Sequence, residues 1–261
     1  MRAVGSAVPR QESSDAARHP GTPGDPRARA GHGGWKFLLV PVVLAGFLVA
    51  ASLLARWLAW RRELAQPGIA PPDWVQFLDV NGEANLPTWF SVVLLASTAL
   101  TALVLGAAHL LGNPRGDRFG LALGVVLLGL SLDELAGIHE RLGGLGNRLL
   151  AGEYLHFTWV VPGAVVAAVL AVALVRGSTS LPARSRRLIL LGFAVYVLGA
   201  LVLETLSGLV LEEWGDRAGY LLVTAAEEFC EMLGVVVVLG GLVRAVELVR
   251  DGRAWVLHPA P

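Results

Sequence analysis

The sequence has little charge and almost no cysteine. Only 16% of its 261 residues are Asp, Glu, Lys or Arg, well below the roughly 25% of soluble domains, and this nearly rules out a soluble enzyme. The 21 basic residues balance 21 acidic ones without a basic run on a folded face, so nucleic acid is not an expected partner. One cysteine, Cys230, excludes an internal disulfide and any cysteine-based zinc module.

Long apolar runs take the place of the missing charge. Six segments have about 20 residues each, enough for a helix to cross a hydrocarbon core of roughly 30 Å. They lie at 37–57, 87–111, 119–139, 156–175, 188–211 and 219–243. We therefore predict an all-α, polytopic membrane protein with a bundle of six transmembrane helices, and expect the lipid bilayer as its surroundings. Small residues such as Gly120 and Gly124 suit close helix packing in lipid.

The basic residues predict the orientation. With the N-terminus inside, 15 of the 21 Lys and Arg fall in cytoplasmic segments and six in outer ones, which predicts that both termini are cytoplasmic. We expect residues 1–34 to be a disordered cytoplasmic tail, 35–250 to be the membrane domain and 251–261 to be a cytoplasmic C-terminal tail. A single Lys among the bases is typical of a GC-rich bacterial genome, so a bacterial inner (plasma) membrane is the expected location.

Acidic residues inside the predicted spans are the most informative feature of the chain. An ionisable group at membrane depth costs several kcal/mol unless it is paired, protonated or bound to metal. Counting about 1.5 Å per residue from the inner basic anchors places six acids roughly 20 to 26 Å up, in one layer of the outer half. These acids are Asp133, Glu134, Glu204, Glu227, Glu228 and Glu231. His139, Glu140 and His156 are predicted at the outer rim of this layer.

The acid layer predicts a metal site. No Lys or Arg occurs at its depth, so six carboxylates cannot all be ionised there, and a divalent cation would satisfy carboxylates and imidazoles together. We expect Glu134 and Glu227 to be catalytic. The predicted metal ligands are Asp133, Glu204, Glu228, Glu231, His139, Glu140 and His156. On a continuous helix His139 would point about 120° away from Asp133, so its role requires the helix to end or unwind before it.

Known metal motifs do not match. His139 and Glu140 are followed by Gly143 where a zincin has its second histidine. Neither Glu134 nor Glu228 has a histidine three residues later, as the di-iron bundles do. The metal site is thus a prediction from the charges and depths of the acids, and the metal's identity stays open.

Three functions fit such a layer. The favoured one is a membrane-embedded, metal-dependent hydrolase or oxidoreductase acting on a lipid-like or outer-face substrate. The alternative is a cation or proton-coupled transporter or channel, and the third is a structural protein whose protonated carboxyls clasp the helices. Transport needs a polar route on both sides of the site, yet the inner half of the acidic spans holds only apolar residues, glycines and Tyr196.

Trp89, Trp159 and Trp214 are expected to form an aromatic belt.

Overall fold

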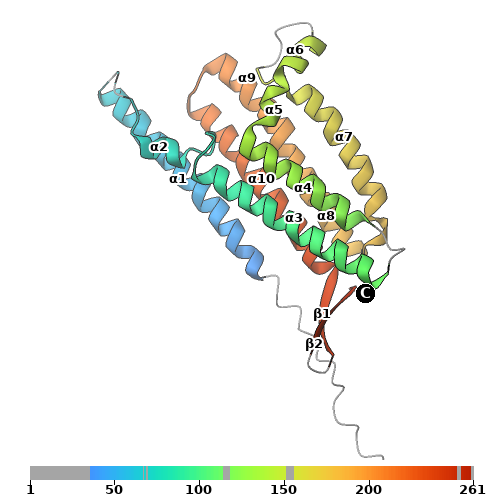
Figure 1. Cartoon of the computed structure of the whole chain (residues 1–261). Coiled ribbons are helices and arrows are strands. Elements are labelled where there is room, and N and C mark those ends of the chain that lie inside the picture. The colour runs from blue at the N-terminus through green and yellow to red at the C-terminus, as the bar shows by residue number, and fades with distance from the viewer. Residues whose placement is uncertain are drawn as a thin grey trace, which may run out of the picture.

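A computed structural model describes residues 36–66, 68, 70–113, 118–150, 156–251 and 254–259 (Figure 1). The predicted tail at 1–34 lies outside these residues. The helices are α1 (Leu39–Ala65), α2 (Asp73–Leu78), α3 (Leu86–Gly112), α4 (Phe119–Ala136), α5 (Ile138–Arg141), α6 (Gly143–Leu150), α7 (Val160–Gly177), η2 (Ser178–Ser180), α8 (Ala183–Val197), η3 (Leu198–Leu203), α9 (Glu204–Trp214) and α10 (Ala218–Arg244).

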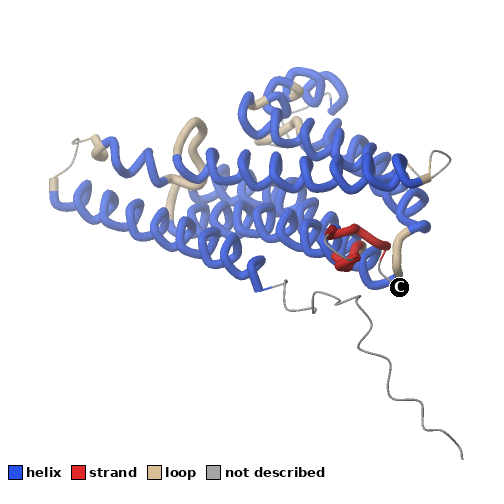
Figure 2. The backbone as a smooth tube through the Cα atoms, turned by 60° about the horizontal axis from the view of Figure 1, so that its bottom comes forward, coloured by secondary structure: helices blue, strands red, loops and turns tan. Residues whose placement is uncertain are grey.

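A short hairpin follows the last helix. Strands β1 (Val246–Asp251) and β2 (Ala254–Pro259) pair in an antiparallel ladder, drawn in red in Figure 2. The sequence analysis anticipated no strand here. The rest of the described secondary structure is helical, as predicted.

Five segments are long and apolar enough to cross a membrane, and this agrees with a multi-pass membrane protein. They are Lys36–Ala65, Leu86–Gly112, Phe119–Ala136, Val160–Ser180 and Ala183–Trp214. They match five of the six predicted spans. The sixth, at 219–243, forms the 27-residue helix α10. It is not among the five because of its charged residues: every 18-residue stretch of α10 contains the three acids Glu227, Glu228 and Glu231.

Helix α10 runs through the middle of the bundle. It packs along α8 and also contacts α1, α3 and α9, as Figure 1 shows. Val235, Val236 and Val238 on α10 are almost fully buried, whereas the apolar helices around it turn large side chains outward, for example Phe47 and Leu135, each 66% exposed. The most acidic helix is therefore shielded from the surroundings by more apolar ones.

Glycines let the helix backbones approach closely. A Cβ added at Gly120 of α4 would lie 2.9 Å from Cα of Gly106 on α3, and one at Gly124 would lie 3.0 Å from the carbonyl oxygen of Ala99. These distances confirm the predicted role of Gly120 and Gly124. A Cβ at Gly192 of α8 would lie 2.5 Å from the carbonyl oxygen of Gly234 on α10. The packing of the central helix therefore also depends on glycines at the helix contact.

Residues 70–85 form a cap, named here the α2 cap, at one end of the bundle. Arg56 of α1 donates hydrogen bonds to both carboxylate oxygens of Asp216, at 2.8 and 2.7 Å, and lies 3.5 Å from Asp79. Asn81 donates to the Tyr220 hydroxyl at 3.2 Å. These bonds tie the cap to α1 and to the start of α10. We call this the cap end of the bundle and the opposite end, with β1 and β2, the hairpin end (Figure 1).

Candidate functional site

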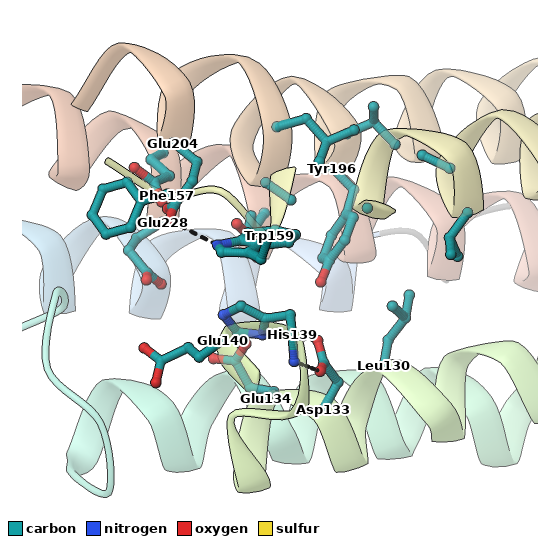
Figure 3. A pocket seen from close by; sticks show the side chains of 18 of the residues that line it. Leu130, Asp133, Glu134, His139, Glu140, Phe157, Trp159, Tyr196, Glu204 and Glu228 are labelled. Atoms are coloured by element: carbon teal, nitrogen blue, oxygen red, sulfur yellow. Dashed lines mark hydrogen bonds and ion pairs between the residues drawn. The ribbon is translucent and has the colours of Figure 1, made fainter. Parts of the chain in front are cut away.

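A cavity of about 400 Å³ opens at the cap end of the bundle. Its walls come from α4, α5, α7, α10, the continuous α8–η3–α9 segment and the loop after α2. We call it the acidic cavity, because its lining includes Glu83, Asp133, Glu134, Glu140, Glu204, Glu227, Glu228 and Glu231. None of the described residues that line it is a lysine or an arginine. Figure 3 shows carboxylates from α4 and α5 facing those from α9 and α10.

Eight of the nine predicted site residues line this cavity, and His156 does not. His156 Nδ1 lies 3.6 Å from Glu212 Oε1, and both side chains are more than 40% exposed. Its ring meets Phe157 edge-on, with centroids 4.7 Å apart. The structure thus places His156 at the surface beside α9, away from the other predicted ligands.

His139 reaches Asp133 because α4 ends between them. Gly137 adopts a left-handed conformation with φ of 55°, and the short helix α5 begins after it. Asp133 accepts a hydrogen bond from the His139 backbone N–H at 2.7 Å, and the His139 ring Nδ1 lies 3.0 Å from its second carboxylate oxygen. A continuous helix would have turned the imidazole away. The break instead produces an imidazole oriented by a carboxylate at the rim of the cavity.

Asp133 also shifts the protonation of this imidazole. Burial lowers the pKa of His139, but the hydrogen bond to Asp133 and the nearby carboxylates raise it, and the net shift is upward. The protonated imidazole therefore stabilises the fold at pH values below its unfolded pKa, and this contribution is lost as the pH rises through the folded pKa.

Asp133→Asn is expected to lower the pKa of His139. Asparagine keeps an oxygen that can accept the His139 backbone N–H but removes the negative charge beside the ring. The pH titration of the His139 ring by NMR, in protein labelled at histidine, measures the change. An unchanged His139 pKa in the variant would contradict the paired geometry.

Trp159 lies in the cavity wall, which its predicted place in an aromatic belt did not anticipate. Its indole N–H donates to Glu204 Oε1 at 3.2 Å, and its ring centroid is 4.6 Å from that of His139. Glu204 directly follows the π-helical turn η3, a distortion that is frequent at functional sites. Trp159 thus links the His139 side of the cavity to the α9 side.

Glu227 is the least satisfied polar group in the described part of the chain. It is only 6% exposed, its carboxyl group lies close to that of Glu204, and its Oε2 has no hydrogen-bond partner among the described residues. A buried acceptor left in this state costs about 1–3 kcal/mol. The cavity thus holds an acceptor that no protein group satisfies.

Sequence reasoning missed several lining residues, namely Asn81, Glu83, Thr88, Phe157, Phe193, Tyr196 and Tyr220. Tyr196 precedes Glu204 by eight residues, about two helical turns, so its shared face with Glu204 was a signal in the sequence. Residues of the α2 cap carried no such signal, because only the folding of the cap onto α1 and α10 brings them to the cavity.

The carboxylates do not converge on one point. Among the described residues, no group of three or more His, Cys, Asp or Glu side chains is arranged so that it could hold a metal ion. The acids instead project from separate helices across the width of the cavity (Figure 3). The predicted ligands other than His156 line one space without forming a preassembled coordination shell.

Comparison with known proteins gives a family without an assigned function. No curated protein and no solved structure matches the chain. Residues 38–245 match a domain of unknown function, DUF8692. Since this match covers most of the chain and all of the helices that build the acidic cavity, the protein belongs to the DUF8692 family.

Proposed function

We propose that this protein is a six-span plasma-membrane protein that binds a positively charged ligand in its acidic cavity. In this proposal α10 is the sixth span, because Glu227 is buried within the bundle and the helices around α10 supply the apolar surface. The cap end faces outward, as the excess of basic residues near the termini suggests. Both termini are then cytoplasmic, and the acidic end of the cavity lies toward the outer side.

The observation that carries the proposal is the unpaired Oε2 of Glu227. A carboxyl oxygen with no hydrogen-bond partner among the described residues, 6% exposed and in the wall of a cavity, is suited to a positive charge that arrives with a ligand. A cation supplies the charge that the lining lacks, since no described lining residue is a lysine or an arginine. The aromatic rings of Trp159 and Tyr196 stand beside the carboxylates, and such rings attract cations over their faces.

Cavity size favours an organic cation over a bare metal ion. The volume of about 400 Å³ lies within the roughly 300 to 1,000 Å³ of small-molecule sites. A metal ion would need several donors within about 2.6 Å, and the described side chains are not arranged in that way.

A binding site is better supported than a transport route. A second cavity of about 30 Å³ lies next to the acidic cavity and shares Leu130, Phe193 and Tyr196 with it. Apart from Tyr196, its described lining is apolar, with residues such as Leu95 and Val238. A hydrated ion or a proton would find no polar group there on its way toward the hairpin end.

A metal-dependent enzyme is the second candidate, and the pairing of His139 with Asp133 favours it. A carboxylate that orients an imidazole is a usual companion of a metal ligand. Glu134 and Glu227 are the proposed catalytic carboxylates in this alternative. The other lining carboxylates would have to move together to complete a coordination shell.

The first test compares a small cation with a neutral molecule of similar size and branching. Protein in nanodiscs is titrated with tetramethylammonium and with neopentanol, and tryptophan fluorescence is recorded. We expect a saturable response to tetramethylammonium alone, weakened roughly tenfold or more in the Glu228→Gln, Glu231→Gln double variant. Equal responses to the two molecules, or no saturable response to the cation, would refute the proposal.

Elemental analysis of the purified protein decides between the two candidates. Stoichiometric Zn, Mn or Fe that is lost in the Glu228→Ala, Glu231→Ala variant would replace the cation-binding proposal with the metal-dependent enzyme. The cation-binding proposal expects no stoichiometric metal.

A further inference from the structure

The acidic cavity has a polar end and an apolar end. Glu204 is the first residue of α9, and Phe193 on the same wall is 11 residues earlier, toward the start of α8, about 16 Å along the helix axis. On α7 the lining runs from Trp159 through Gly163 to Leu170. In Figure 3 the carboxyl groups of Glu140 and Glu204 lie toward one end, and Leu130 lies toward the other, beyond Tyr196.

Apolar side chains from three helices form the deeper end. Leu130 comes from α4, Ala167 and Leu170 from α7, and Phe193 and Val197 from α8. A small inorganic or organic cation would leave this part of the cavity unused. The shape and polarity of the cavity match a molecule with a charged head and an apolar chain.

The cavity also reaches the lipid-facing surface of the bundle. Val166 lines the cavity and is nevertheless 54% exposed. Helices α4 and α7 both contribute to the lining, and their close contact lies 11 residues from Val166, where a Cβ at Gly177 of α7 would meet the Phe119 ring of α4. Val166 is therefore a point at which the cavity lining meets the outer surface of α7. Neighbouring outward residues are apolar, for example Leu132 and Val169, 55% and 64% exposed, so this point faces acyl chains.

We propose that the ligand is a membrane amphiphile with an ammonium headgroup and an apolar chain, and that it enters from the bilayer at Val166 of α7. This inference rests on the proposed cation-binding function. The ammonium group lies against Glu227 and Trp159, where it provides a charge for the unpaired carboxylate oxygen. The chain lies along Leu130, Leu170 and Phe193. Entry at Val166 lets the chain remain in an apolar environment, so that only the head must be desolvated.

The test measures the contributions of the ligand's headgroup and of its apolar chain to binding separately. Protein is placed in nanodiscs of phosphatidylglycerol, whose headgroup has no ammonium to compete. Dodecyltrimethylammonium, tetramethylammonium and dodecanol are then titrated separately, with tryptophan fluorescence as the readout. We expect dodecyltrimethylammonium to bind at least about tenfold more tightly than tetramethylammonium, because it also fills the apolar end, and dodecanol to give no saturable response.

A matched pair of variants on α7 tests where the chain lies. Ala167 lines the cavity, whereas the adjacent Ala168 is exposed and does not line it. Ala167→Phe is expected to remove the advantage of dodecyltrimethylammonium and to leave tetramethylammonium binding intact. Ala168→Phe is expected to change neither, so it controls for the added ring.

Each outcome has a separate meaning. Tetramethylammonium binding without any advantage for the long-chain cation, or an advantage that Ala167→Phe does not reduce, would overturn this inference and leave the cation site standing. Failure of both cations to bind would remove the proposed function itself. A dodecanol response equal to that of the long-chain cation would show that charge plays no part, and would overturn both.

Discussion

Glu227→Gln is expected to abolish cation binding and to make the protein more stable. A buried charge pair that loses one partner typically costs 2 to 5 kcal/mol, so we expect affinity for the cation to fall roughly thirtyfold or more. The free protein should gain about 1 kcal/mol, because a buried carboxyl with an unpaired oxygen is replaced by an amide that can donate to Glu204. Titration with tetramethylammonium and thermal unfolding in the same detergent measure the two effects.

The direction of the stability change separates a binding site from a structural clasp. If the carboxyls served to hold the helices together, as the third sequence-based hypothesis supposes, Glu227→Gln would lower the unfolding temperature and binding would not be its main effect. Glu213→Gln is the matched control, since Glu213 is exposed and lies outside the cavity lining. It should alter neither binding nor stability.

Gly234→Ala is expected to cause the largest loss of stability. A Cβ at this position would lie 2.6 Å from the backbone nitrogen of Tyr196 and 2.7 Å from the carbonyl oxygen of Gly192. Both are backbone atoms of α8 and cannot turn aside as a side chain would, so α8 and α10 must separate. We expect a loss of about 3 kcal/mol. Tyr196, which lines the cavity, would move with α8, so cation binding should weaken too.

Gly129→Ala provides the control for this change. Gly129 also lies within a helix, but a Cβ there would meet no atom within 4 Å. Alanine is favoured over glycine in a helix by up to about 1 kcal/mol, so this variant should be unchanged or slightly stabilised. If Gly234→Ala unfolds at the same temperature as Gly129→Ala, the close approach of α8 and α10 is wrong.

The membrane spans and the axial positions of the acids could be predicted from the sequence, because both depend only on the residues within one segment. Hydropathy over about 20 residues depends on composition alone, and it located five segments that meet the criteria for a span. The axial position of each acid follows from a rise of about 1.5 Å per residue. Asp133, Glu204 and Glu227 were therefore assigned to one layer, and all three line one cavity.

Other parts of the site depend on where a helix stops. The periodic pattern of 119–139 continues through Gly137, so sequence reasoning extended the helix past its end at Ala136. The left-handed turn at Gly137 then brings His139 back to Asp133. Trp159 was predicted in an aromatic belt, although its N–H bonds to Glu204. In both cases a specific side-chain interaction determines the final orientation.

The sequence alone determined that apolar helices build this protein and that acids without basic partners occur at one level among them, because composition and helical rise act within each segment. Only the tertiary structure decided which faces turn inward, how the α2 cap brings Asn81 and Glu83 to the cavity, and which side chains of α4 and α7 line it. These features arise from contacts between segments far apart in the chain, such as the Arg56–Asp216 pair. The free energies of such contacts depend on the packing of the whole bundle.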